Sequence, residues 1–243
     1  MKRPLQALLL ALTGTGLLHT ALLTDTYLRY VKAGLRPALI VSGAVLLLLG
    51  LAGAVTRDRQ HPAGDTGHGH DHTGTPRVAW LLFLPALSLL FHAPPALGAY
   101  TAARADTKPV AVQKKGFAPL PAASPLPLTL TDFTKRVQQD RSRAIEHRTV
   151  RLTGFVTPAG EGDGWYLTRI IFSCCAADSQ TIKVRVYGSE APPADTWLAV
   201  TGTWHPRGTL GTRTAEAALD ARDVRPVAQP VNAYTDDLPL APS

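Results

Sequence analysis

LQALLLALTGTGLLHTALL at residues 5–23 and PALIVSGAVLLLLGLAGAV at residues 37–55 are two uncharged apolar stretches of nineteen residues each. An α-helix of about 20 apolar residues crosses the roughly 30 Å hydrocarbon core of a bilayer. The intervening residues 24–36 mix tyrosines with arginines and a lysine, a composition typical of the membrane interface. The sequence therefore predicts a transmembrane helical hairpin. A cleaved secretory signal is the alternative for the first stretch, which follows the basic start Met1-Lys2-Arg3, but no small-x-small cleavage site comes after it.

A third apolar run occupies residues 78–100 and contains Pro85 and the pair Pro94-Pro95. Proline interrupts helical hydrogen bonding, which lipid does not replace. We expect a kinked third span that ends near Phe91, with a re-entrant or interfacial segment as the alternative. A short basic N-terminus usually stays in the cytoplasm, so three spans would place the C-terminal domain outside it; the remaining basic residues leave the opposite orientation open.

The charge distribution argues against a nucleic-acid-binding protein. The net charge is +7, and residues 1–128, with 12 basic and 5 acidic side chains, account for all of it. Residues 129–226 contain 13 basic and 11 acidic side chains. The basic excess therefore accompanies the apolar stretches, where it sets orientation and meets anionic lipid headgroups, and we expect no nucleic-acid partner.

Residues 56–77 form a polar connection that is rich in histidine and glycine. Four of the eight histidines, His61, His68, His70 and His72, fall within twelve residues. Neutral imidazole is a good ligand for zinc, nickel and copper, so the loop is a candidate metal site. A solvated, disordered connector whose histidines bind nothing is the alternative.

Turn signals and alternating apolar residues predict a β-rich soluble domain at residues 129–234. It follows an Ala/Pro-rich linker at residues 101–128 and precedes a disordered tail at residues 235–243. We expect a helix over residues 132–146, capped by Thr129 or Thr131. Five strands are predicted, at residues 149–156, 165–172, 181–187, 197–204 and 219–227. The predicted fold class is α + β, with three transmembrane helices followed by a small OB-fold-like barrel.

Cys174 and Cys175 are the only cysteines, and they stand within RIIFSCCAAD at residues 169–178. Neighbouring Cα atoms lie about 3.8 Å apart, below the roughly 4.4–6.8 Å of most disulfides, so a bond between them would be strained. On a regular strand the two side chains would point to opposite faces, and both can meet one ion only at a bend after the strand. Asp178 and the Arg169 guanidinium are candidate neighbours for thiolate-based metal binding or redox chemistry, and two small buried residues at a strand end are the alternative.

Several stretches resemble the YcgQ-like family of bacterial membrane proteins, described as permease subunits of unknown function. They are the N-terminal hairpin, the histidine loop, residues 93–98 (APPALG), 154–156 (GFV), Arg169 with 172–178 (FSCCAAD), 197–202 (WLAVTG) and 230–234 (PVNAY). The resemblance implies a multi-pass protein of the bacterial plasma membrane that acts with a separate multi-span permease. It also implies a link to metal handling, with zinc or another divalent metal as the candidate ion. Ala233 stands where the family commonly has proline.

No phosphate-binding loop, zinc-protease signature or nucleophile elbow is present, and we predict no catalytic residues. The favoured hypothesis is a membrane accessory subunit of a permease system, linked to divalent metal. A membrane-anchored thiol redox or metal-binding protein that uses the adjacent cysteines is one alternative, and a purely structural anchor is the other.

Overall fold

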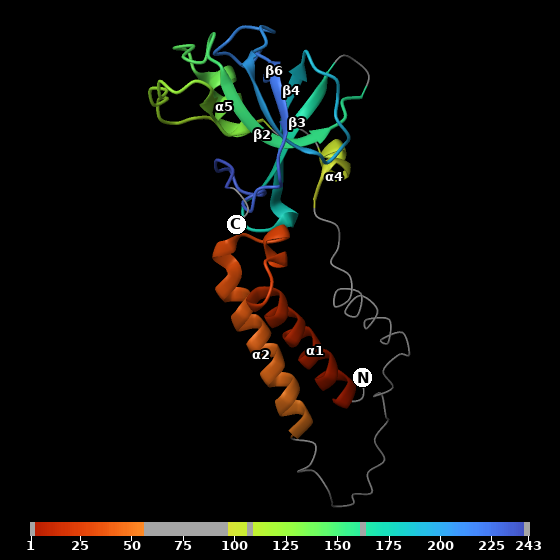
Figure 1. The fold of residues 1–243 in the computed structure, drawn as a ribbon. Helices are drawn as coiled ribbons and strands as arrows, with labels where there is room; N and C mark the ends of the chain where they lie inside the picture. Colours follow the sequence, from red (N-terminus) through yellow and green to blue (C-terminus); the bar gives the residue numbers. More distant parts are fainter. Residues whose placement is uncertain (1–2, 56–96, 106–108, 161–163, 241–243) are drawn as a thin grey trace, which may run out of the picture. The chain divides into compact units, whose positions relative to one another are not determined.

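The structure is a computed structural model that describes residues 3–55, 97–105, 109–160 and 164–240 (Figure 1). It divides into two compact units, Met1–Ala96 and Leu97–Ser243, and each unit is described by itself. The histidine loop and most of the predicted third span lie outside the described residues. What the structure shows is an α + β protein with two N-terminal apolar helices and a six-stranded mixed sheet.

The first unit is a helical hairpin in its described part. Helices α1 (Arg3–Leu22) and α2 (Arg36–Val55) pack against each other, joined by the short 3-10 helices η1 (Thr26–Arg29) and η2 (Ala33–Leu35). Both are long and apolar enough to cross a membrane. They approach closely at Gly14, where a Cβ atom would lie 2.6 Å from the Gly43 carbonyl oxygen, so a larger residue would separate the helices. The two apolar helices predicted from the sequence are confirmed, and their insertion in a membrane stays a prediction.

The second unit is built on a mixed sheet. Its strands are β1 (Leu126–Pro127), β2 (Val150–Thr157), β3 (Trp165–Phe172), β4 (Ser179–Tyr187), β5 (Trp197–Trp204) and β6 (Ala218–Pro226). Their hydrogen-bonded order is β1-β2-β3-β4-β6-β5, and β2 also pairs with β5. The pairings β2-β3-β4-β6-β5-β2 therefore form a closed circuit. Within this circuit β4 and β6 run parallel and the other pairs run antiparallel.

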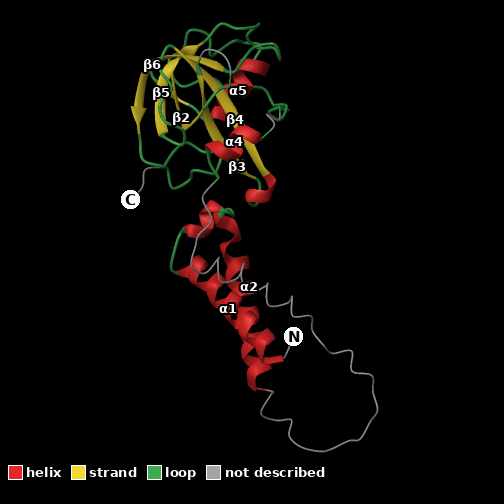
Figure 2. Ribbon diagram, turned by 90° about the vertical axis from the view of Figure 1, so that its right-hand side faces the viewer, coloured by secondary structure: helices red, strands yellow, loops and turns green. Residues whose placement is uncertain are grey.

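Alternation along the strands decides which side chains form the core. On β4, Ile182, Val184 and Val186 are buried, while Lys183 and Arg185 between them are partly exposed. The buried set packs with apolar residues of β2, β3, β5 and helix α5 (Leu130–Gln139). Figure 2 shows α4 (Ala99–Arg104) and α5 beside the strands, and both helices contact β2. A strand whose side chains alternate in this way fits a sheet with one face against the core.

The predicted helix after Thr129 is shorter than expected. Thr129 caps it as predicted, since its side chain accepts a hydrogen bond from the Asp132 N–H at 3.0 Å. The helix ends at Gln139 and not at residue 146, because Asp140 has an extended backbone and its Oδ1 accepts hydrogen bonds from the N–H and hydroxyl of Ser142. Aspartate competes in this way with helical hydrogen bonding and favours a turn.

Segments outside the predicted elements are fastened to the second unit. The Arg148 guanidinium donates hydrogen bonds to the carbonyls of Pro121 and Ala123, and β1 pairs in parallel with β2. At the start of α4, the Ala99 N–H donates to the Asp195 carboxylate, which satisfies one of the free amides of that helix end. These contacts hold much of the segment between residues 97 and 128 on the sheet unit.

Candidate functional site

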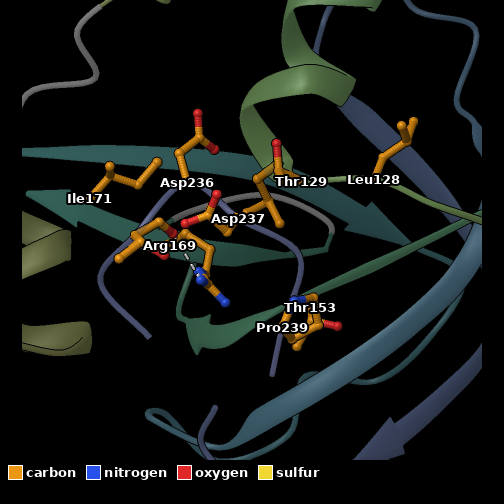
Figure 3. A pocket seen from close by; sticks show the side chains of 10 residues that line it. Leu128, Thr129, Thr153, Arg169, Ile171, Asp236, Asp237 and Pro239 are labelled. Carbon is orange, nitrogen blue, oxygen red and sulfur yellow. Dashed lines mark hydrogen bonds between the residues drawn. The ribbon is translucent and has the colours of Figure 1, made fainter. Parts of the chain in front are cut away.

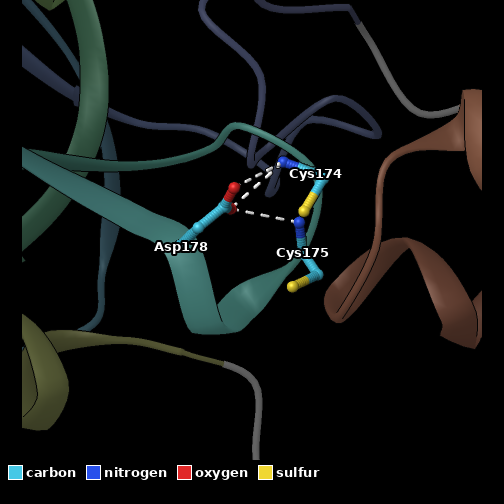
Figure 4. A group of neighbouring side chains, drawn as sticks. All are labelled: Cys174, Cys175 and Asp178. Atoms are coloured by element: carbon cyan, nitrogen blue, oxygen red, sulfur yellow. Dashed lines mark hydrogen bonds between the residues drawn. The ribbon is translucent and has the colours of Figure 1, made fainter.

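The two cysteines lie in a tight turn between β3 and β4 (Figure 4). Phe172 and Ser179 are the last paired residues of the two strands, and the 3-10 helix η5 (Ala176–Asp178) closes the connection. The Asp178 Oδ1 atom accepts hydrogen bonds from the N–H groups of Ser173, Cys174 and Cys175, each at 3.1 Å. One carboxylate thus accepts hydrogen bonds from three consecutive backbone amides and stabilises the reversal of the chain direction. The bend that the sequence required is present.

The turn brings both sulfur atoms and the carboxylate together. The ligand atoms of Cys174, Cys175 and Asp178 all lie within 4.8 Å of one another. Both thiols are free, Cys174 exposed and Cys175 partly exposed. The Cys175 sulfur accepts a hydrogen bond from the Asp178 N–H, and the Asp178 side chain accepts one from the Cys175 N–H, which makes a reciprocal cap. This arrangement resembles the Ser/Thr-x-x-Glu capping box, and the Cys-x-x-Asp spacing is the sequence signal that predicts it.

Hydrogen bonding fixes the protonation of this group. The pKa of Cys174 is raised to about 11, chiefly by its hydrogen bond to the Asp178 carboxylate and then by its hydrogen bond to Cys175. The pKa of Asp178 is lowered, first by the backbone N–H groups of Cys174 and Cys175. At neutral pH the turn therefore holds a carboxylate beside a protonated Cys174 thiol. A thiol is a weaker nucleophile and a weaker ligand than a thiolate, so a metal must displace its proton.

The donor set suits a thiophilic cation. From the backbone, Asp178 Oδ1 accepts three hydrogen bonds and Oδ2 accepts one, from the Cys174 N–H at 3.1 Å. The Cys174 thiol also donates to this carboxylate, so a metal that displaces the thiol proton would take the place of that hydrogen bond. Two sulfurs and one oxygen make three donors, and tetrahedral zinc takes four. The turn therefore supplies an incomplete zinc coordination set with one open position.

Arg169 does not join the thiols through a hydrogen bond within the described residues. The Arg169 side chain lines a small cavity (Figure 3). Its guanidinium donates to the carbonyl oxygens of Asn232 and Thr235, both at 3.0 Å, and lies 5.4 Å from the centroid of the Trp197 ring. Burial lowers its pKa to about 10, against the opposing charges of Asp236 and Asp237, and it stays charged at neutral pH. The adjoining cavity has a volume of about 10 Å³, room for about one water. The residue thus ties the C-terminal segment to β3.

The C-terminal segment makes a second set of contacts close to the cysteine turn. The Tyr234 ring stacks on Phe172 with centroids 4.6 Å apart, and the Phe172 N–H donates to the Tyr234 carbonyl at 3.0 Å. The Tyr234 hydroxyl donates to the Leu97 carbonyl at 3.0 Å. Phe172 is the last residue of β3, so these contacts fix the strand end from which the turn departs.

Three of the predicted metal ligands come together and four lie elsewhere in the chain. Cys174, Cys175 and Asp178 form the cluster just described. The histidines of the loop, His61, His68, His70 and His72, lie outside the described residues, so their metal binding stays a prediction.

A small α + β unit with a thiol-bearing turn is thus the class that the fold and site define. The family model of the DUF1980 C-terminal domain, an uncharacterised family, matches residues 130–235. The match covers α5, all strands from β2 to β6 and the cysteine turn, and less than half of the 243-residue chain. Comparisons with curated proteins and with solved structures give no match.

Proposed function

We propose that this chain is a membrane-anchored accessory subunit of a transport system, whose cysteine turn binds a thiophilic divalent metal such as zinc. The observation that carries the proposal is the meeting of two thiols and a carboxylate within 4.8 Å, in a chain that also has two span-length apolar helices. The metal would be bound by Cys174, Cys175 and Asp178, and it would act either as a Lewis acid or as the ion that is transported.

The surface of the hairpin supports a lipid environment. Only 17% of the apolar stretch Leu5–Leu22 and 11% of the apolar stretch Ala33–Val55 is buried. The core helix of a water-soluble protein, in contrast, is mostly buried. The exposed large side chains include Leu8, Val41, Leu48, Leu49 and Val55. Lipid is the solvent in which such a surface is stable, and we place the chain in a bacterial plasma membrane with the sheet unit outside the cytoplasm. Extraction from membranes by detergent but not by high salt or alkali is expected, and release by salt alone would contradict the anchor.

The strand order supports an OB-fold-like barrel for the second unit. OB-folds are five-stranded, partly open Greek-key barrels, and the circuit β2-β3-β4-β6-β5-β2 has five members. Folds of this kind bind many unrelated ligands, so the fold leaves the ligand to be decided by the site.

Serine replacements give the sharpest test of metal binding. Serine also caps a helical turn, so Cys174→Ser with Cys175→Ser keeps the hydrogen-bonding pattern and removes the soft ligands. Cobalt(II) titration of the detergent-solubilised full chain is expected to give a thiolate-to-cobalt charge-transfer band that zinc abolishes and that the double variant lacks. His205→Ser removes a metal-binding side chain outside the turn and is the matched control. A band of unchanged intensity in the double variant would refute the site.

The accessory role rests on the number of spans. Transporters are commonly built from internal repeats of several helices, and no internal repeat is visible in this sequence. We therefore place the hairpin against a separate multi-span permease. The partner should co-purify with the full chain in mild detergent, and a chain that purifies alone and binds no zinc would leave only the structural anchor.

Thiol redox chemistry is less well supported by the turn. The raised pKa of Cys174 keeps its thiol protonated at neutral pH, and the pair lacks the Cys-x-x-Cys spacing of redox motifs.

A further inference from the structure

A second cavity of the sheet unit has a volume of about 410 Å³, and none of Cys174, Cys175 and Asp178 lines it. It is bounded by α5, β3, β4, the segment at Pro109 and Val110, and the loop that runs from Arg213 to Ala217. Small-molecule sites commonly have volumes of about 300–1,000 Å³ and mostly apolar walls with a few polar groups. The size of this cavity falls in that range.

The charged side chains of the cavity are unequally paired. Glu216, its acidic residue, forms an ion pair with Arg207 at 3.3 Å. Lys183 and Arg213 form no ion pair within the described part of the chain, and Arg213 is exposed. Two cations are thus available to a ligand, while the carboxylate is already engaged.

Apolar and aromatic surface adjoins these cations. The Lys183 ammonium lies 5.8 Å from the centroid of the Tyr166 ring, and Ile182 and Val110 also line the cavity. Partial burial lowers the pKa of Lys183. The half-buried Gln138 lines the same cavity, and its amide makes no hydrogen bond to any described residue. An amide can donate and accept, so it can orient a polar ligand.

We propose that this cavity binds a small organic anion, with its carboxylate or phosphate between Lys183 and Arg213 and its apolar part against Tyr166. Lysine provides a compact charge and arginine a planar fork that matches both kinds of anion. An inorganic ion would leave most of the volume and the aromatic wall unused. This site is independent of the proposed metal site, because no residue is shared between them.

Phenyl phosphate is the probe, and two compounds are its matched controls. Phenol lacks the charge, and inorganic phosphate lacks the ring. Calorimetric titration into the detergent-solubilised full chain, with a chelator present, is expected to show saturable binding of phenyl phosphate and at least tenfold weaker binding of each control. Benzoate, in place of phenyl phosphate, distinguishes a carboxylate site from a phosphate site. A chelator excludes the metal, so a positive result here and a negative cobalt titration separate the two proposals.

Lys183→Met and Arg213→Gln are each expected to weaken phenyl phosphate binding by about tenfold, the loss of one hydrogen bond to a charged group. Arg151→Gln removes an exposed cation of β2 outside the cavity and should leave binding unchanged. Circular dichroism and the thermal midpoint check that each variant folds. Three results would overturn the proposal. They are no binding of phenyl phosphate by the unmodified chain, binding of phenol as tight as that of phenyl phosphate, and a loss of affinity in Arg151→Gln as large as in the two cavity variants.

Discussion

The Asp178 carboxylate should suppress the reactivity of Cys174, and its removal should expose that thiol to alkylation. In metal-free protein the pKa of Cys174 is raised from 9.0 to about 11, with the Asp178 hydrogen bond as the largest cause. At pH 8 about one thiol in a thousand is then ionised, against about one in ten at the ordinary value. Asp178→Asn removes the negative charge and leaves an amide oxygen that can still accept the backbone amides.

The expected change in rate is smaller than the change in thiolate. Full reversal of the shift would raise the thiolate fraction about 100-fold. A thiolate of lower pKa is also less nucleophilic, with a Brønsted coefficient of about 0.4–0.5. A pKa that is lower by two units therefore reduces the rate constant of the thiolate by about tenfold. We therefore expect Cys174 in Asp178→Asn to react with iodoacetamide about tenfold faster at pH 8. The advantage should vanish near about pH 10 and reverse above about pH 11, where Cys174 is ionised in both proteins and the thiolate of higher pKa is the better nucleophile.

The assay follows Cys174 alone by using Cys175→Ser as the background. Serine retains a hydrogen-bonding neighbour, and mass spectrometry of the modified peptide reports the rate over pH 7–12. Asp223→Asn, which changes a carboxylate of β6 outside the turn, is the matched control. Equal rates for Cys175→Ser with and without Asp178→Asn would show that the carboxylate does not control the thiol, and the electrostatic reasoning would be refuted.

Three further changes test the sheet unit, each by urea denaturation of the detergent-solubilised chain followed by tryptophan fluorescence. Leu152→Ala should lower the free energy of unfolding by about 2–5 kcal/mol, because Leu152 is fully buried in the core, and a loss below 1 kcal/mol would contradict that packing. Tyr234→Phe should lower it by about 1 kcal/mol through loss of the hydrogen bond to Leu97 while the ring stack remains, so no change would place the hydroxyl in water. Thr168→Val should raise it by about 1 kcal/mol, since the buried hydroxyl has no partner among the described residues, and a loss would reveal one.

The strands with the clearest patterns were predictable to the residue. β3 and β5 begin and end where the sequence predicts: both are rich in aromatic and branched residues, Gly164 directly precedes β3, and a proline-containing turn follows β5 at Pro206. β1 was not predictable, since two residues carry no periodicity and its parallel pairing depends on a strand more than twenty residues away. The short helix α4 was not predictable for a similar reason, because its first turn is stabilised by Asp195, which is distant in the sequence.

The site was predictable in its residues and only partly in its geometry. Adjacent cysteines followed by a possible bend indicated that both thiols could face one partner, and the structure has that bend. The three amides that Asp178 gathers were not foreseen, since they belong to the backbone and depend on where β3 ends. Arg169 was expected near the thiols from its place in the sequence, yet it binds carbonyls of the C-terminal segment more than sixty residues away. The anion cavity needs five separate segments, and no local pattern predicts such a convergence.

The cysteine turn combines two roles that variants can separate. Asp178 shapes the turn through its hydrogen bonds to the backbone, and metal binding would exchange thiol protons for the ion. Removal of Asp178 should therefore affect both the loop and the affinity, whereas Cys-to-Ser changes should affect the affinity alone. A set of three protein donors also leaves tetrahedral zinc one position open, which a second protein's ligand can fill. An ion held in this way is easier to pass on than one in a closed site of four ligands, and for that reason we propose an accessory subunit and not a structural metal site.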